Sequence, residues 1–214
     1  MASVLIAIPT YESITPDTFK AVWDLDKGAH DCSFEFVRGY DVATARNKIA
    51  QKAIDGGYNY LLMVDNDVTP PSDALLNLIG HGVECVSGFY LHRNADNRPS
   101  NRTNVCKLAD EGGIPYFNYP LESEYTVEEL ACFRSEGKNL VEIHGGGMGC
   151  ILVKTEVFGR VKYPWFDWVN YDDDNRGMLS EDLYFCEKVR KKGIKRYVDP
   201  RVACGHLFRR IETC

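Results

Sequence analysis

Several features of membrane and secreted proteins are missing from this chain of 214 residues. It has no uncharged apolar run near the roughly 18 residues that a transmembrane helix requires. The apolar start at residues 4–8 has no basic segment before it, since the first lysine is Lys20. We therefore expect a cytoplasmic protein with neither a transmembrane segment nor a signal peptide. The end of the chain, eight residues after His206, is also compatible with a domain of a longer multidomain protein.

An excess of positive charge is absent as well. The chain has 25 Lys and Arg residues against 31 Asp and Glu residues, which gives a net charge of −6. Binding to a phosphate backbone depends on a broad basic face, so we expect no nucleic-acid partner. A local group of lysines and arginines at residues 188–196 fits a solvated helix end, with a contact to a membrane surface or a partner as the alternative.

Metal-binding signatures of cysteine and histidine are also lacking. The chain has eight cysteines but no C-x-x-C spacing, which argues against a thiolate zinc site. Several cysteines lie in apolar segments, where a free thiol behaves as a small hydrophobic group and suits a reducing cytosol; disulfides stay an open alternative. His30, His81 and His92 have no paired spacing, and we expect them at the surface or in ordinary packing. For His144, beside a glycine turn, the sequence leaves the choice between a structural and a functional role open.

Three catalytic motifs are missing too. There is no Walker A lysine motif and no G-x-S-x-G. The glycine turn at residues 144–149 lacks the third glycine of G-x-G-x-x-G and leads into an expected strand instead of a helix. These absences argue against a P-loop enzyme, an α/β-hydrolase and a dinucleotide-binding fingerprint.

Strand and helix signals alternate through the first ninety residues. Apolar or β-rich runs predict strands at residues 3–8, 33–37, 60–64 and 83–90. Capping residues predict helices after Thr15-Pro16, after Asp41 and after Pro70-Pro71. This order predicts an α/β fold with a mainly parallel, Rossmann-like sheet flanked by helices. In such sheets, ligands bind beyond the carboxyl ends of the strands.

The pattern changes after residue 90. Residues 92–140 are polar and show no sustained period, so we expect an irregular excursion with at most one short helix near residues 126–133. Regular signals then return. They predict strands at 140–143, 150–153 and 196–198, and helices at 155–161 and, after a Ser180 cap, through Lys192. No repeat or linker divides the chain, which predicts a single domain over residues 1–214.

An acidic motif follows the apolar run at residues 60–64. Asp65-Asn66-Asp67 is one of three D-x-D patterns, and the other two fall at a helix end and in a loop that does not fit a calcium site. Carboxylates two residues apart at the end of a strand can point the same way and hold a hard divalent cation. The alternative is a capped, solvated turn.

Two further segments strengthen this metal prediction. Ser180-Glu181-Asp182 places two carboxylates in the first turn of a helix, where the helix dipole favours their ionised forms. His206 follows a small glycine near the end of the chain. Asp67, His206 and a diphosphate would form a mixed oxygen and nitrogen coordination sphere, for which Mn²⁺ is a more natural occupant than Ca²⁺. Taken alone, Asp182 could be a simple helix-end charge, and His206 a packed histidine.

Together these segments resemble the GT-A fold glycosyltransferases, GT2-like enzymes that use a nucleotide sugar and a divalent metal. The chain is also similar to glycosyltransferase domains of the chlorovirus type. The likeness covers about residues 1–90 and 141–208, and its segments are Ile8–Glu12, Ala45–Asn47, Tyr60–Asp67, Gly146–Gly149, Ser180–Phe185 and Gly205–His206. It implies a nucleotide-sugar-binding half at 1–90, an acceptor-side excursion at 91–140 and an acceptor and catalytic half at 141–214.

The resemblance also implies residues that bind the donor. They are Pro9, Thr10, Tyr11, Arg46, Asp65, Asn66 and Asp67. Residues 9–11 would receive the nucleotide base, and Arg46 would lie near the diphosphate or brace the aspartate pair. Asp65 would contact the ribose or the metal, whereas Asp67 and His206 would ligate Mn²⁺ or Mg²⁺.

Residues on the acceptor side are implied in the same way. Asp182 would face the acceptor hydroxyl as the base, with Glu181 as the next candidate. Gly146–Gly147 would let the backbone approach the sugar closely, because glycine has no Cβ. Trp165 and Trp168 would offer apolar faces to a sugar ring, with ordinary packing as the alternative.

The expected function is transfer of a sugar from a nucleoside diphosphate, with UDP as the expected nucleotide, to a hydroxyl of a glycan acceptor. A sugar-nucleotide pyrophosphorylase is one rival, but it would want a glycine-rich basic loop after the first strand, where the chain has Pro9–Glu12. A non-catalytic nucleotide- or carbohydrate-binding module is the other. The sequence gives no indication of the sugar, the acceptor, the linkage or the stereochemical course.

Overall fold

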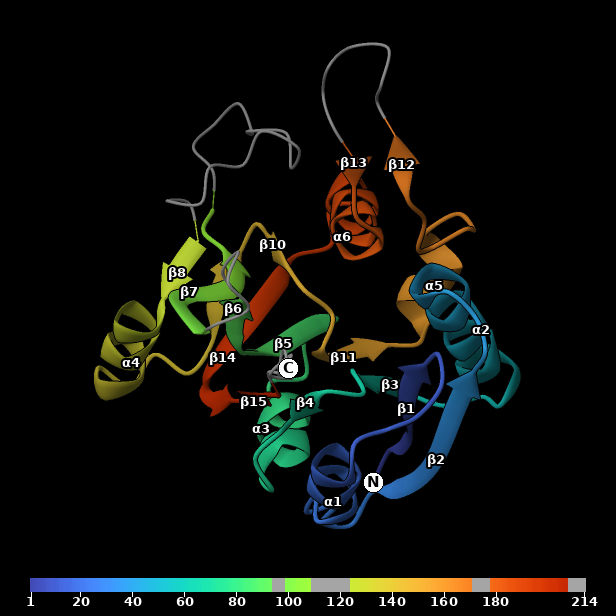
Figure 1. Ribbon diagram of the computed structural model, residues 1–214, viewed down its shortest axis with the longest axis horizontal. Coiled ribbons are helices and arrows are strands. Elements are labelled where there is room, and N and C mark those ends of the chain that lie inside the picture. The colour runs from blue at the N-terminus through green and yellow to red at the C-terminus, as the bar shows by residue number, and fades with distance from the viewer. Residues whose placement is uncertain (94–98, 109–123, 171–177, 208–214) are drawn as a thin grey trace, which may run out of the picture.

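A computed structural model of the protein describes residues 1–93, 99–108, 124–170 and 178–207. A seven-stranded sheet forms its centre, in the order β2-β1-β3-β11-β5-β14-β9 (Figure 1). The strands in that order are β2 (Asp31–Arg38), β1 (Ser3–Thr10), β3 (Tyr60–Val64), β11 (Cys150–Lys154), β5 (Cys85–Phe89), β14 (Arg196–Ala203) and β9 (Val141–Ile143). Only β11 and β9 run antiparallel to the others, so the predicted mainly parallel α/β sheet is confirmed.

Helices cover both faces of this sheet (Figure 1). One apolar cluster packs α1 (Pro16–Trp23) and α3 (Ala74–Gly80) on one face. A second cluster packs α2 (Val42–Asp55), α5 (Glu156–Arg160) and α6 (Glu181–Lys191) on the other face. Successive residues of a strand point to opposite faces, so a strand between two helical layers is apolar throughout, as the run at residues 60–64 predicted.

The helix starts follow the capping signals. Thr15 Oγ1 accepts a hydrogen bond of 3.1 Å from the Thr18 backbone N–H at the start of α1. Asp41 Oδ1 accepts one of 3.0 Å from the Thr44 N–H at the start of α2. Each side chain satisfies a backbone donor that the first helical turn leaves without a partner. Because β1 ends at Thr10 and β2 at Arg38, each of these helices begins a few residues after the carboxyl end of a strand.

The position of β11 was not predicted. It lies between β3 and β5 and runs antiparallel to both, with Cys150 opposite Val64 at the end of β3. The residue before it, Gly149, accepts a hydrogen bond of 3.0 Å from the Asp65 backbone N–H through its carbonyl oxygen. This register brings the glycine turn against the acidic motif, although Asp65 and Gly149 are 84 residues apart in sequence (149 − 65).

The predicted irregular excursion is wrong for the part that the structure describes. Residues 91–146 contribute a small second sheet of β6 (Leu91–Arg93), β7 (Pro99–Cys106), β8 (Glu124–Thr126) and β10 (Gly145–Gly146). The predicted short helix is confirmed as α4 (Val127–Ser135). Residues 94–98 and 109–123 of the predicted excursion lie outside the described residues. Strand β7 is polar along most of its length, so it carries no alternating apolar signal.

Two short ladders complete the topology. β4 (Val68–Thr69) pairs with β15 (Gly205–His206), with His206 opposite Val68, and β12 (Val169–Asn170) pairs with β13 (Met178–Leu179). The first ladder joins the segment after the acidic motif to a segment late in the chain. Within the described ranges, no helix has the length and apolar character needed to cross a bilayer. The cysteines described in the structure are free thiols.

Candidate functional site

Three cavities meet at the acidic motif, at the carboxyl ends of β1 and β3. The main cavity has a volume of about 460 Å³, the Pro9 cavity about 360 Å³ and the Glu12 cavity about 280 Å³. Asp67 lines all three, and Asp65 lines the main cavity and the Pro9 cavity. The main cavity is lined by Asp65, Asp67, Tyr90, His92, Asn104, Cys106, Glu124, Gly146, Gly147, Ser180, Asp182, Leu183 and His206.

The segment that was expected to receive a nucleotide base lies in the Pro9 cavity. Residues 9–11 line it together with Tyr40, Asp41 and the acidic motif. Asn66 Nδ2 donates a hydrogen bond of 2.9 Å to the Ser13 carbonyl oxygen, which ties the loop after β1 to the acidic motif. The structure thus brings the predicted donor-binding segments together, and their roles stay predictions.

Arg46 is buried behind the acidic motif, with 3% of its surface exposed. Its Nη2 donates to both carboxylate oxygens of Asp65, at 3.0 and 3.2 Å, and its Nε lies 3.3 Å from Glu181 Oε1. Burial opposes the charged guanidinium, but the two carboxylates outweigh it and raise the pKa of Arg46 above its ordinary value. Of the two roles suggested for Arg46, the geometry supports bracing of the aspartate pair.

Glu181 belongs to the same buried network. It is 5% exposed and does not line the main cavity, because its position at the start of α6 turns it towards Arg46. Burial raises the pKa values of Glu181 and Asp65, and the attraction of Arg46 offsets this effect only in part. The role of Glu181 as a reserve catalytic base stays a prediction, which this burial against Arg46 does not favour.

Asp182, the next residue, has a different environment. It lines the main cavity, and its Oδ1 accepts a hydrogen bond of 2.7 Å from the Leu183 backbone N–H. The Ser180 hydroxyl also donates to this oxygen instead of capping the helix backbone. The side chain is thus held at the N-terminus of α6 and faces the cavity. That is the position the sequence predicted, and its catalytic role stays a prediction.

Asp67 and His206 come together although 139 residues separate them in sequence. His206 Nε2 lies 3.6 Å from Asp67 Oδ2, and the Leu207 N–H donates to the Asp67 carbonyl oxygen at 2.8 Å. The other ring nitrogen of His206, Nδ1, lies 2.8 Å from the Leu91 carbonyl oxygen. A carbonyl oxygen only accepts hydrogen bonds, so Nδ1 carries the proton. Nε2 is therefore the ring nitrogen that faces the Asp67 carboxylate.

This pair of electron-rich atoms suits a cation. Neutral imidazole nitrogen and carboxylate oxygen are both ligands of Mn²⁺-type ions, and a hydrogen bond from the second ring nitrogen is the usual support of a metal-binding histidine. Among the described residues, no group of three or more His, Cys, Asp and Glu side chains forms a metal site. Asp65, the third predicted ligand, is held by Arg46. Asp65 also lines the main cavity, and its role as a ligand stays a prediction.

Gly146 and Gly147 line the main cavity, and tight packing requires glycine at both. A Cβ on Gly146 would lie 2.6 Å from the Asn104 carbonyl oxygen, and one on Gly147 would lie 2.4 Å from the Tyr90 hydroxyl oxygen. Both distances are below ordinary contact. The glycines let β7 and Tyr90 approach the turn, and their proximity to a sugar stays a prediction.

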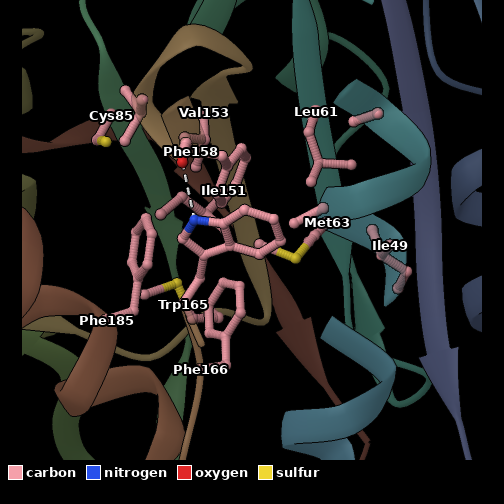
Figure 2. Packing of buried hydrophobic residues seen from close by; sticks show 14 of the residues in the cluster. Ile49, Leu61, Met63, Cys85, Ile151, Val153, Phe158, Trp165, Phe166 and Phe185 are labelled. Atoms are coloured by element: carbon pink, nitrogen blue, oxygen red, sulfur yellow. Dashed lines mark hydrogen bonds between the residues drawn. The ribbon is translucent and has the colours of Figure 1, made fainter. Parts of the chain in front are cut away.

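Trp165 lies in the apolar core, which agrees with the packing alternative that the sequence left open. It is 5% exposed and packs among Phe158, Phe166 and Phe185 in the cluster that Figure 2 shows. Its Nε1 donates to the Phe158 carbonyl oxygen at 2.8 Å and to the Val161 carbonyl oxygen at 2.9 Å. Trp168 is 43% exposed but lies outside the three cavities.

The sequence missed five residues of the main cavity, which are Tyr90, His92, Asn104, Cys106 and Glu124. They come from the end of β5 and from the small sheet. His92 was expected in packing or at the surface, but its Nε2 lies 3.0 Å from Glu124 Oε1 in the cavity wall. No sequence signal links these two residues, because the β6–β7 and β7–β8 pairings alone bring them together.

The main cavity is strongly acidic. Asp65, Asp67, Glu124 and Asp182 line it, and the lining contains no lysine or arginine among the residues that the structure describes. A bare phosphate would be repelled there at neutral pH. The cavity can hold a neutral polar molecule, or an anion that arrives with a cation.

Comparisons with known proteins address the fold. No family model matches the chain, and no curated protein matches it in sequence. A solved structure of A197 from STIV superposes with a TM-score of 0.62 at 18% identity, covering 96% of this chain and 86% of that one. A structure of GalNAc-T7 with UDP, GalNAc and Mn²⁺ superposes with a TM-score of 0.62 at 12% identity, covering 97% of this chain and 44% of that one.

At these identities the likeness establishes architecture. Both neighbours match nearly the whole chain, including the seven-stranded sheet with its flanking helices. The chain therefore has a GT-A-type α/β fold, as its sequence predicted.

Proposed function

We propose that the protein is a metal-dependent glycosyltransferase that moves a sugar from a nucleoside diphosphate, with UDP as the expected nucleotide, to a hydroxyl of a glycan. The observation that carries this proposal is that His206 Nε2 lies 3.6 Å from Asp67 Oδ2, and that Asp67 lines all three cavities. GT2-like character and the likeness to chlorovirus-type domains stay predictions.

Mn²⁺ or Mg²⁺ is the cofactor of this proposal, with Asp67 and His206 as its protein ligands. When bound, the ion would neutralise the charge that develops on the departing diphosphate. The acidic lining of the main cavity supports a need for such an ion, because the part of this lining that the structure describes contains no lysine or arginine. The structure of the neighbour GalNAc-T7 contains UDP and Mn²⁺, which is consistent with this cofactor.

The remaining roles follow from position. Residues 9–11 would hold the nucleotide in the Pro9 cavity, and Arg46 would fix the acidic motif from behind. Asp182 would accept the proton of the acceptor hydroxyl as the sugar bond breaks. Residues 1–90 would thus bind the donor, and residues 141–214 would supply the acceptor side of one domain.

Calorimetry of UDP binding with Mn²⁺ and with EDTA tests this proposal. We expect binding with Mn²⁺ and little binding in EDTA, because the acidic site repels a bare diphosphate. Equal affinity in both conditions would contradict the metal assignment. Incubation with a panel of UDP-sugars then separates an enzyme, which releases UDP, from a binding module, which does not.

A further inference from the structure

The small sheet contributes a second polar pair to the main cavity. The proposed function uses neither residue of this pair. His92 Nε2 lies 3.0 Å from Glu124 Oε1, and both residues line the cavity. The two side chains thus lie within ion-pair distance of each other. The pair orients the Glu124 carboxylate and leaves its second oxygen, Oε2, for another donor.

Glu124 Oε2 is the important atom. It is buried and has no hydrogen-bond partner among the residues that the structure describes. Buried polar atoms in proteins are almost always satisfied, and an unsatisfied carboxylate oxygen is especially unfavourable. An oxygen of this kind in the wall of a cavity indicates that a bound molecule supplies the missing donor.

The small sheet fixes the backbone that carries this carboxylate. Arg102 Nη1 donates to the Glu124 carbonyl oxygen at 2.9 Å, and Thr103 Oγ1 donates to the Tyr125 carbonyl oxygen at 2.9 Å. The next residue, Thr126, begins α4 with a reciprocal capping box to Glu129. Hydrogen bonds on successive residues preorganise β8, which favours selective recognition over nonspecific charge.

The chemistry of the cavity narrows the choice of ligand. Phosphate oxygens cannot donate to Glu124 Oε2, and the other carboxylates of the cavity add to the repulsion of any anion. A neutral sugar carries hydroxyl groups that donate to carboxylates, and its ring needs no countercharge. We propose that the His92–Glu124 pair forms a sugar-reading subsite, in which Glu124 Oε2 accepts a hydrogen bond from a sugar hydroxyl.

This inference rests on the proposed function for the source of the sugar. The hydroxyl belongs either to the sugar of the donor or to the acceptor, and both present the same chemistry. A donor-sugar contact would act on the affinity for a UDP-sugar but not on that for UDP. An acceptor contact would act on the binding of a free glycoside.

Ligand-observed NMR titration with UDP, four UDP-hexoses or UDP-N-acetylhexosamines and the matching methyl glycosides, all in diamagnetic Mg²⁺, tests the subsite. The variant is Glu124→Gln, which keeps the shape of the side chain and weakens its acceptor strength. We expect about a tenfold loss of affinity for a UDP-sugar or for a methyl glycoside, with UDP affinity unchanged, since a hydrogen bond to a charged group carries an effect of that order. Glu142→Gln is the matched control, because Glu142 pairs with Lys195 at the surface, 2.8 Å away, outside the cavity.

Stability separates recognition from a structural role. Removal of an unsatisfied buried charge should leave the melting temperature of Glu124→Gln unchanged or higher, whereas loss of a purely structural ion pair would lower it and leave sugar affinity intact. Should Glu124→Gln not fold, His92→Asn at a more exposed position removes the partner of Glu124, and a smaller loss is expected in the same titration.

The outcomes are distinct from those of the proposed function. A wild-type protein that fails to bind UDP would contradict the nucleotide proposal, and the methyl glycosides would still test the subsite. Three results would each overturn the subsite. The sugar affinity of Glu124→Gln is unchanged, the wild type binds no sugar, or Glu124→Gln loses a bound Mn²⁺ while its sugar affinity stays intact.

Discussion

The two acidic pairs of the site look alike in sequence but differ in environment. In each pair one carboxylate, Asp65 or Glu181, is paired with the buried Arg46. The described ion pairs of Arg46 do not include Asp67 or Asp182, which line the main cavity together with Asp65. We call Arg46, Asp65 and Glu181 the inner layer, because their ion pairs fix the positions of these side chains. Asp67 and Asp182 form the outer layer, which faces a ligand.

This division shows what a single buried cation does. Arg46 compensates two inner carboxylates that would otherwise be unfavourable in a nonpolar environment. It also ties the end of β3 to the start of α6, so the backbone that carries the outer carboxylates is held at both places. We expect substitutions in the inner layer to act on stability, and those in the outer layer to act on binding and turnover.

The largest effect is expected at Asp182. Asp182→Asn keeps the shape of the side chain and removes its basicity, so sugar transfer should fall by roughly 10²- to 10⁴-fold. UDP affinity should stay the same. Steady-state transfer and calorimetry on the same variant check both quantities, and near-normal turnover would remove Asp182 from the mechanism.

Arg46 should show the largest effect on stability. Arg46→Met leaves the buried Glu181 and the partly buried Asp65 without their cation, and we expect a loss of about 3–5 kcal/mol in the free energy of unfolding. Lys52→Met on the same helix is the control, because Lys52 pairs with Glu35 at the surface and should cost about 0–1 kcal/mol. Urea denaturation measures both, and equal losses would abolish the distinction between the layers.

Asp67 and Asp65 provide the direct comparison within one motif. Asp67→Asn should weaken Mn²⁺-dependent UDP binding by at least about 10- to 100-fold, because the loss of a residue that only supports a metal ligand already costs that much. The stability of the protein should not fall. Asp65→Asn removes a partner of Arg46, so it should lower the melting temperature. The same two assays on both variants decide, and a reversed pattern would exchange their roles.

The smallest effect is a pH dependence at Glu181. Burial raises the pKa of this carboxyl above its ordinary value of 4.5. A raised pKa means that folding disfavours the ionised form, so the stability of the wild type relative to Glu181→Gln should be greatest below pH 4.5 and fall as the pH rises through the pKa of the folded state. Denaturation of both proteins between about pH 4 and pH 7 tests this. If the wild type instead gained stability over Glu181→Gln as the pH rises, this would contradict the raised pKa of Glu181.

Much of the central fold could be predicted because its signals are local. The cap at Asp41, the continuous apolar run at residues 60–64 and the acidic motif directly after it each report on their own backbone. The parallel order follows from helices between successive strands. By contrast, the apolar segment at residues 150–153 indicates a strand, but nothing in it indicates an antiparallel strand between β3 and β5.

The sequence predicted those parts of the site that belong to short motifs. Asp67 and His206 could be linked through the chemistry of metal ligands, yet His92 and Glu124 belong to polar strands whose pairing depends on long-range register. Burial is also invisible in a motif. Trp165 and Trp168 lie three residues apart in one aromatic loop, and only the packed structure shows that the first belongs to the core. Glu181 and Asp182 differ for the same reason.

The antiparallel strand β11 also has a consequence for the order in which the chain folds. Strands β3 and β5 are separated in the sheet by a strand that begins at Cys150, so residues 1–90 cannot complete their own hydrogen-bonded sheet as they leave the ribosome. Contacts between segments this far apart in sequence slow folding and leave strand edges open meanwhile. We therefore expect the nascent first half to depend on protection from aggregation until β11 has been synthesised.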